Sequence, residues 1–191
     1  MYKLCKTEES TARQKLIENG LMELMRQSRF ETISVSSLCN YVGVPRNSFY
    51  RYFNTKEDTL LALIDHTVLE ANEYSIRVWS GGEEMELADL EAFFGYWQGK
   101  RDFLDAIVKN DRSWLLIERS ISFLEQKRMN TKESILSEAF AKEQRHYIVT
   151  YGMMSILLRW HRSGYQATLE EMAKVAYDLF SSSNIIMQDV L

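Results

Sequence analysis

The stretch that decides the fold runs from Phe30 to Leu61 and reads FETISVSSLCNYVGVPRNSFYRYFNTKEDTLL. Ser34 is a good N-cap for a short helix, and Gly43 suits the left-handed conformation that ends one. Pro45 fits the first turn of the next helix, because its missing N–H is not needed there. Two short helices joined by such a turn cross steeply, as in a helix-turn-helix. The predicted helices are 35–42 and 46–52.

The second of these helices has one polar face and one apolar face. At about 100° per residue, Phe49 and Phe53 lie away from the polar side chains. Arginine bonds a guanine edge in bidentate fashion, asparagine bonds an adenine edge, and tyrosine hydroxyls suit phosphate oxygens. The alternative is a structural helical hairpin with solvated polar side chains, but the turn glycine, the proline and the polar face coincide. The polar-face residues are Arg46, Asn47, Tyr50 and Arg51.

The rest of the chain also has helical periodicity. One proline and eight scattered glycines favour long helices over sheet. Thr55 with Asp58 and Thr168 with Glu171 have the spacing of capping boxes at helix starts. We therefore predict an all-α fold of about nine helices, with a loop at 80–84. The further predicted helices are 7–27, 56–78, 86–98, 101–110, 112–127, 132–163 and 168–190.

Charge and composition narrow the class of protein. The net charge is −4, yet residues 1–58 hold nine Lys/Arg against seven Asp/Glu, so the N-terminal part is the basic end. Cys5 and Cys39 are too few for a disulfide scaffold. No stretch approaches the roughly 20 apolar residues of a membrane span. We expect a cytoplasmic protein without a membrane segment.

Motifs of catalysis and metal binding are not legible. The histidines are His66, His146 and His161, and no pair has the spacing of helix-borne metal ligands. We find no Gly-rich phosphate loop, nucleophile elbow or Ser/His/Asp arrangement. We expect no enzyme, no metal and no cofactor, while an enzyme that uses the aromatic C-terminal interior stays open as an alternative.

As a joint pattern, residues 11–61 resemble the N-terminal signature of the TetR/AcrR family of transcriptional repressors. The most compact part of the pattern is Gly43-Val44, then the aromatic string 49–53, then Lys56-Glu57. Pro45 and Asn47 depart from the family's usual residues, which bears on the operator sequence more than on binding. The matching residues are Thr11, Arg13, Ile17, Leu24, Phe30, Thr32, Ser34, Val35, Leu38, Gly43, Val44, Phe49, Tyr50, Tyr52, Phe53, Lys56, Glu57 and Leu60.

The resemblance implies roles for individual residues at DNA. Base contacts would come from Arg46, Asn47 and Arg51, and phosphate contacts from tyrosines and Lys56. Two serines of the first short helix would lie near the DNA backbone. The residues expected at DNA are Ser36, Ser37, Pro45, Arg46, Asn47, Ser48, Tyr50, Arg51, Tyr52 and Lys56.

The resemblance also implies a domain plan. Residues 1–55 would be the helix-turn-helix DNA-binding domain, and 56–191 a helical effector-binding and dimerisation domain. The protein would bind a palindromic operator as a homodimer through about 145–163 and 168–190, and an unknown small-molecule effector would release it. The alternative is a helical dimeric small-molecule-binding or interaction module without DNA binding.

Aromatic side chains are frequent in the C-terminal part and could line a ligand pocket, although a stripe at helical spacing is more often packed core. Near the end of the long helix, Arg159, His161 and Arg162 either steer an anionic effector or complement the helix terminus, and we favour the second reading. The candidate ligand residues are Phe94, Trp97, Phe103, Trp114, Phe123, Tyr147 and Tyr151.

Overall fold

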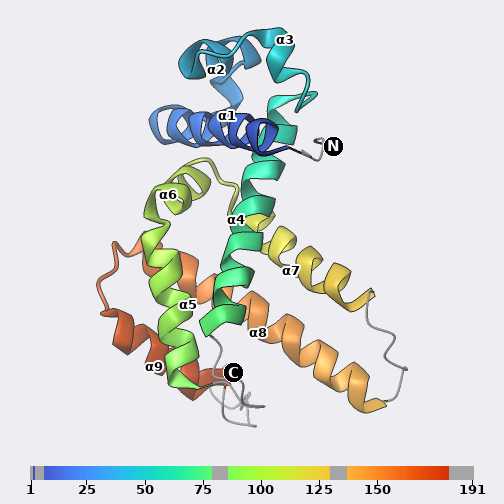
Figure 1. Cartoon of the computed structure of the whole chain (residues 1–191). Coiled ribbons are helices and arrows are strands. Elements are labelled where there is room, and N and C mark those ends of the chain that lie inside the picture. Colours follow the sequence, from blue (N-terminus) through green and yellow to red (C-terminus); the bar gives the residue numbers. More distant parts are fainter. Residues whose placement is uncertain (1, 3–6, 79–85, 130–136, 181–191) are drawn as a thin grey trace. The chain divides into compact units, whose positions relative to one another are not determined.

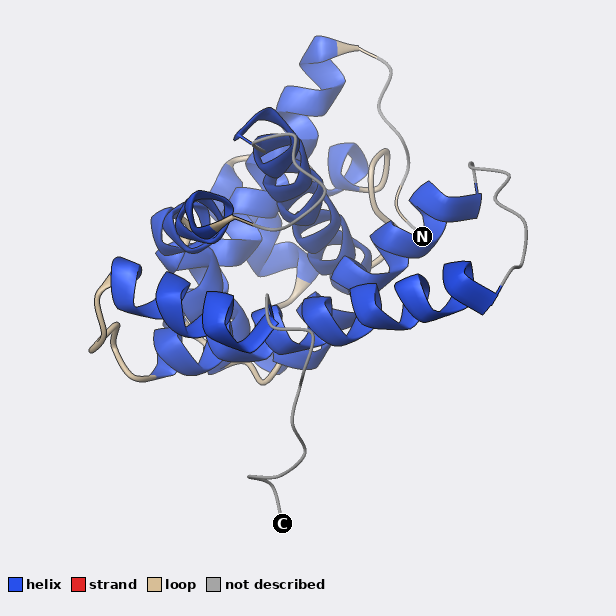
Figure 2. Ribbon diagram, turned by 90° about the horizontal axis from the view of Figure 1, so that it is seen from below, coloured by secondary structure: helices blue, strands red, loops and turns tan. Residues whose placement is uncertain are grey.

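A computed structural model describes residues 2, 7–78, 86–129 and 137–180. These ranges contain helices, turns and loops and no strand, so the all-α prediction is confirmed (Figure 1, Figure 2). The elements are α1 (Glu8–Gln27), the 3-10 turn η1 (Phe30–Thr32), α2 (Val35–Val42), α3 (Arg46–Phe49), α4 (Lys56–Val78), α5 (Leu87–Gly99), α6 (Arg101–Lys109), α7 (Ser113–Met129), α8 (Ser137–Arg162) and α9 (Leu169–Phe180).

The helix boundaries follow the predicted caps. The Ser34 side chain accepts the N–H of Ser37 and begins α2, and Gly43 ends it in the left-handed region at φ 67°. At α4, Thr55 Oγ1 accepts the N–H of Asp58 at 3.1 Å. The predicted box of Thr168 and Glu171 also forms at the start of α9. Local side-chain hydrogen bonds therefore set these boundaries.

The third helix is shorter than predicted. Helix α3 ends at Phe49 rather than at Tyr52, because the bonds that follow are tighter: Arg51 N–H donates to Ser48 O, and Tyr52 N–H to Phe49 O. Such bonds to the third residue back belong to 3-10 geometry. The predicted loop at 80–84 and the predicted helix ends at 132 and 190 lie outside the described residues.

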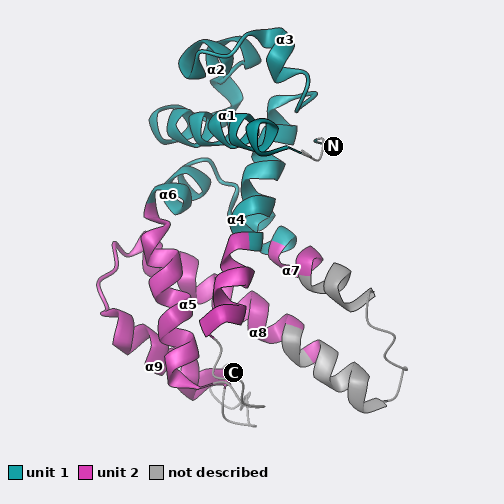
Figure 3. Ribbon diagram, in the orientation of Figure 1, with its two compact units in different colours: residues 1–69, 102–119 teal, residues 70–101, 120–191 magenta. Residues whose placement is uncertain are grey.

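The chain divides into two compact units (Figure 3). Unit 1 comprises residues 1–69 and 102–119, and unit 2 comprises 70–101 and 120–191. The boundary crosses α4, α6 and α7, so unit 1 holds the helix-turn-helix together with α6 and the start of α7. The predicted end of the DNA-binding domain at residue 55 remains a prediction.

Unit 1 packs α1 closely against α2. A Cβ added at Gly20 would lie 2.1 Å from Val42 Cγ1, so this close approach requires glycine. The buried apolar side chains of unit 1 include residues of α1, α2, α3 and the turn after it, α4 and α6. Those that are fully buried include Ile17, Leu21, Met25, Leu38, Phe49, Phe53, Ile64, Leu104 and Ile107.

Unit 2 packs α5 against α8 and α9. Phe94 and Trp160 meet edge to face at 5.7 Å between ring centroids, and Trp160 Nε1 donates to Ala167 O at 2.9 Å. Two consecutive left-handed residues, Gly164 and Tyr165, turn the chain from α8 into α9. Over the ranges that the structure describes, no helix is both long and apolar enough to cross a membrane.

Candidate nucleic-acid interface

The α2–α3 turn buries one face and exposes the other, as the periodicity predicts. Phe49 and Phe53 are fully buried. Arg46, Asn47 and Arg51 are exposed beside them. The apolar face is thus held by the core of unit 1, and the hydrogen-bonding groups point to solvent, where a nucleic acid could reach them.

Arg46 and Tyr50 interact with each other on the exposed face. Arg46 Nη2 donates to the Tyr50 hydroxyl oxygen at 3.3 Å, and the guanidinium carbon lies 6.0 Å from the tyrosine ring centroid. The hydrogen bond to Tyr50 is the main cause that raises the pKa of Arg46, so the guanidinium stays a cation. Two predicted DNA-contacting residues therefore lie side by side.

The other residues predicted to contact DNA differ in their exposure and in the hydrogen bonds that they make within the protein. Ser37 Oγ accepts the N–H of Ser34 at 2.9 Å and donates to Ser34 O at 2.8 Å, so this hydroxyl caps α2. Ser36 and Pro45 are exposed, whereas Ser48 and Tyr52 are partly buried. Whether each one touches DNA remains a prediction.

The side chain of Lys56 makes hydrogen bonds to backbone carbonyls of the protein itself. Its Nζ donates to the carbonyl oxygens of Phe30 at 2.8 Å, Glu31 at 3.1 Å and Ile33 at 2.8 Å. The ammonium also lies 4.6 Å from the centroid of the Phe30 ring. An ammonium has three donors. A phosphate contact by Lys56 therefore competes with three bonds to the η1 segment.

The predicted ligand residues fall in both units. Phe94 and Trp97 on α5 are buried in unit 2, and Phe123, Tyr147 and Tyr151 also belong to it. Phe103 and Trp114 belong to unit 1. Trp114 is 58% exposed and Tyr151 is 42% exposed. Of the seven residues, those on α5 share one buried face, and the ligand assignment as a whole remains a prediction.

The basic end of α8 contributes to a local packing cluster. His161 is buried, and its Nδ1 lies 2.8 Å from the Tyr165 hydroxyl oxygen. Arg159 and Arg162 are exposed in the last turn of the helix. Cations at a helix C-terminus face the negative end of its dipole. Among the described residues, no group of three or more His, Cys, Asp or Glu is arranged to hold a metal ion.

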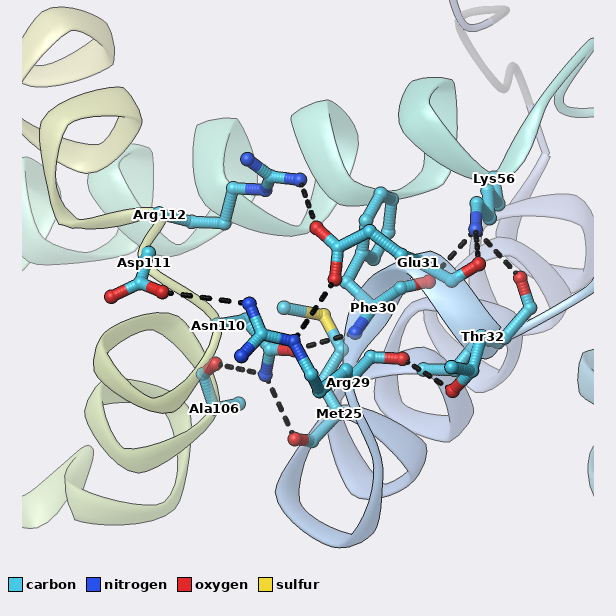
Figure 4. A network of polar contacts seen from close by, with 11 residues as sticks. Met25, Arg29, Phe30, Glu31, Thr32, Lys56, Ala106, Asn110, Asp111 and Arg112 are labelled. Atoms are coloured by element: carbon cyan, nitrogen blue, oxygen red, sulfur yellow. Dashed lines mark hydrogen bonds and ion pairs between the residues drawn. The ribbon is translucent and has the colours of Figure 1, made fainter.

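The turn between α6 and α7 makes contacts that were not predicted from the sequence. Asn110, Asp111 and Arg112 contact the end of α1 and the η1 segment in unit 1 (Figure 4). The residues Asn110 and Asp111 suit a turn, and Asp111 is in the left-handed region at φ 56°. That local signal indicates a turn but says nothing about its partners, which lie far away in the sequence.

The comparisons with known proteins found structural likeness only. No protein-family model matches the chain, and no curated protein matches it. A TetR transcriptional regulator from Streptococcus agalactiae is 17% identical, with a TM-score of 0.61 over 91% of this chain and 96% of that one. Thermus thermophilus FadR, a TetR-family repressor in complex with lauroyl-CoA, is 18% identical, with a TM-score of 0.51 over 91% and 95%.

A third solved structure is the dihydroxyacetone kinase operon activator DhaS. It is 18% identical, with a TM-score of 0.56 over 87% of this chain and 93% of that one. At these identities the likeness establishes the fold. The chain therefore has the fold of TetR-family transcription regulators, as the sequence resemblance implied, and those neighbours are regulators rather than enzymes.

Proposed function

We propose that this chain is a DNA-binding transcription regulator, and that it acts as a repressor on a palindromic operator. The observation that carries the proposal is the exposed row of Arg46, Asn47 and Arg51, backed by the fully buried Phe49 and Phe53. Guanidinium and amide groups on a short helix and the turn that follows it match the chemistry of base edges in a major groove.

We also propose that the protein acts as a homodimer through α8 and α9. Ile148 is 53% exposed on α8, and Val175 and Leu179 are 49% and 50% exposed on α9. Val175 and Leu179 are four residues apart, on one flank of the helix. A second copy of the chain would cover these apolar side chains, and a two-fold axis is what a palindromic site requires.

A small-molecule effector is the third part of the proposal. One neighbour is bound to lauroyl-CoA, which supports an effector site in the helical part of this chain as well. We place the candidate site in unit 2, around Phe94, Trp97, Phe123 and Tyr147. An effector releases DNA only if it binds the DNA-free form more tightly, and DNA then weakens effector binding by the same factor.

Selection of binding sites from a randomised duplex library tests the DNA-binding proposal. The purified full chain is expected to enrich a palindromic sequence, with half-sites centred about one helical turn or more apart. Gel-shift titration against the enriched duplex and a scrambled one then gives the specificity ratio. Equal affinity for the two duplexes would contradict the proposal and favour an interaction module without DNA binding.

A reporter assay decides the sign of regulation. The enriched operator is placed over a promoter, and transcription is compared with and without the protein. A repressor lowers transcription, whereas an activator raises it. Adding lauroyl-CoA to the gel-shift reaction is the first effector test, and release of DNA at a concentration that leaves an unrelated DNA-binding protein bound is the expected positive result.

A further inference from the structure

Asn110, at the turn that follows α6, is a buried amide with all of its hydrogen-bonding groups in use (Figure 4). The residue is 1% exposed. Its Oδ1 accepts the N–H of Phe30 at 2.6 Å, and its Nδ2 donates to the carbonyls of Met25 and Ala106, both at 2.8 Å. Moving any partner would leave a buried polar group unpaired, which is costly. The amide therefore fixes the positions of the groups that it joins.

Two of these groups lie on either side of the corner between α1 and η1. Met25 is in the last turn of α1, where carbonyls lack partners within the helix. Phe30 opens η1, and Arg29 before it supplies no side-chain cap. Asn110 satisfies both positions, although it is 80 residues from Phe30 in the sequence. Its side chain thus links the last turn of α1 to the start of η1.

Charged residues join the same two segments around Asn110. Arg112 Nη2 lies 2.8 Å from Glu31 Oε1, and the Arg112 guanidinium carbon is 5.3 Å from the Phe30 ring centroid. Lys109 Nζ donates to the carbonyl of Arg26 in the last turn of α1. Exposed pairs of this kind stabilise little one by one. Together they connect the end of α6 and the α6–α7 turn to the same corner.

A lysine of α4 also hydrogen-bonds to the backbone of Phe30. Asn110 binds the Phe30 N–H, and Lys56 binds the Phe30 carbonyl together with those of Glu31 and Ile33. Ser34, the N-cap of α2, follows Ile33 directly. The direction in which the chain enters α2 is consequently set by side chains from α4 and from the α6–α7 turn.

We infer that the α6–α7 turn, residues 110–112, positions the DNA-reading helices, and that Asn110 is the residue that contributes most to this role. Asn110 acts through the Phe30 peptide and not by touching DNA. The inference rests on the proposed function, because it concerns how α2 and α3 are oriented for the operator. According to this inference, the orientation of the DNA-reading helices depends on α6 and its turn, which lie outside the helix-turn-helix.

The test compares Asn110→Ala with wild type in the full-length protein. Asn19→Ala, at an exposed asparagine of α1, is the matched control. Affinity is measured for the selected operator and for versions with one base pair added or removed between the half-sites. We expect Asn110→Ala to bind the selected operator about tenfold more weakly and to discriminate less between spacings, since its buried bonds are lost. Asn19→Ala should match wild type.

The preference for one operator spacing distinguishes a change in the orientation of the DNA-reading helices from a loss of folded protein. A variant that is only partly folded loses active molecules but keeps the wild-type ranking of operators. Wild-type affinity together with wild-type ranking in Asn110→Ala would overturn the inference, and so would a loss that is equal for all spacings. If Asn110→Ala does not fold, Arg112→Gln removes the partly exposed pair with Glu31 instead, and the same change of ranking is expected at smaller amplitude.

Amide hydrogen exchange of the DNA-free protein gives a readout that needs no operator. Asn110→Ala should speed exchange in residues 30–44 while unit 2 keeps wild-type rates. Unchanged exchange in 30–44, or faster exchange throughout the chain, would overturn the positioning role. If wild type binds no duplex, the proposed function fails, and exchange alone still decides whether Asn110 holds the corner.

Discussion

The helix-turn-helix and the α8–α9 pair differ in what they expose to water. On α3 and the turn after it, Arg46 and Arg51 point outward from a buried aromatic backing. On α8 and α9 the outward side chains include Ile148, Val175 and Leu179, each about half exposed. A charged surface is stable in water without a partner, whereas an apolar one is stabilised when it is covered. The difference is consistent with the proposed partners, a polyanion for the first surface and a second copy's apolar surface for the other.

The largest expected effect comes from charging the apolar surface. Val175→Glu combined with Leu179→Glu should convert the proposed dimer into a monomer, because each copy would have to bury two carboxylates at the proposed interface. Operator affinity should fall by about a hundredfold or more, since each half-site is then bound without the other. Analytical ultracentrifugation measures the oligomeric state, and gel shift measures the affinity.

A matched control keeps this experiment specific. Gln166→Glu adds a carboxylate at an exposed position of the α8–α9 turn that is not one of the proposed interface residues, and it should leave the proposed dimer intact. A dimer that survives the double glutamate variant would mean that the two copies meet elsewhere. A chain that is monomeric as wild type would remove the dimer proposal altogether.

The next effect in size concerns the charged surface itself. Arg46→Ala should weaken binding to the selected operator by about 1–3 kcal/mol and relax the preference at one base pair in each half-site, if the guanidinium reads a base edge. Fluorescence anisotropy with the operator and its single-base variants measures both changes. Arg77→Ala, an exposed arginine of α4 in unit 2, is the control and should bind as wild type.

A variant of Lys56 tests whether this residue contacts a DNA phosphate. Because its ammonium donates to three carbonyls, Lys56→Met should lower the free energy of unfolding by about 1.5–3 kcal/mol. The salt dependence of DNA binding should keep its wild-type slope. A slope reduced by about one would instead identify a phosphate contact, as the family resemblance implies. Urea denaturation and anisotropy at several salt concentrations distinguish these outcomes.

The smallest expected effect is a pH dependence inside unit 1. His66 Nδ1 on α4 lies 2.9 Å from Glu18 Oε2 on α1, and this hydrogen bond is the main cause that raises the pKa of His66. The stabilisation is therefore present below the ordinary histidine pKa and is lost as pH rises through the raised one. His66→Gln should abolish that slope.

Denaturation at about pH 6 and about pH 9 measures the difference, which we expect to stay below about 1 kcal/mol in this partly exposed pair. Lys15, which opposes the shift, and Asp65, which adds to it, also act on this histidine. The slope must therefore be compared between wild type and variant rather than read from one protein. Identical slopes in both would show that the protonation of His66 does not contribute to the pH dependence of stability.

Local cues were enough to predict the helix-turn-helix. Ser34, Gly43 and Pro45 mark boundaries through their own backbone preferences, and the alternation around Phe49 and Phe53 shows which side is buried. These signals lie within one or two turns of the structure that they specify. The helix boundaries and the buried face of the α2–α3 turn could accordingly be read from the sequence, apart from the early end of α3.

Contacts between distant segments were beyond such cues. The hydrogen-bonding pattern of Asn110 depends on where α6 meets α1, and the three carbonyls that hold Lys56 depend on where η1 meets α4. Likewise, the frequency of aromatic side chains in the C-terminal part made Trp114 a candidate ligand residue without showing that it is 58% exposed. A period tells which residues share a face, but it does not tell what covers that face.

Unit 1 is discontinuous in the chain, and this bears on how the protein is made. Its first segment ends at residue 69 and its second begins at 102, so the 32 residues 70–101, which belong to unit 2, emerge from the ribosome in between. Because domains generally fold as they are synthesised, the N-terminal helices wait for Asn110 before their corner is closed. With the role inferred for Asn110, a nascent chain paused before that point lacks the contacts that position the proposed DNA-reading helices, and a chimaera that carries residues 1–55 alone lacks them permanently.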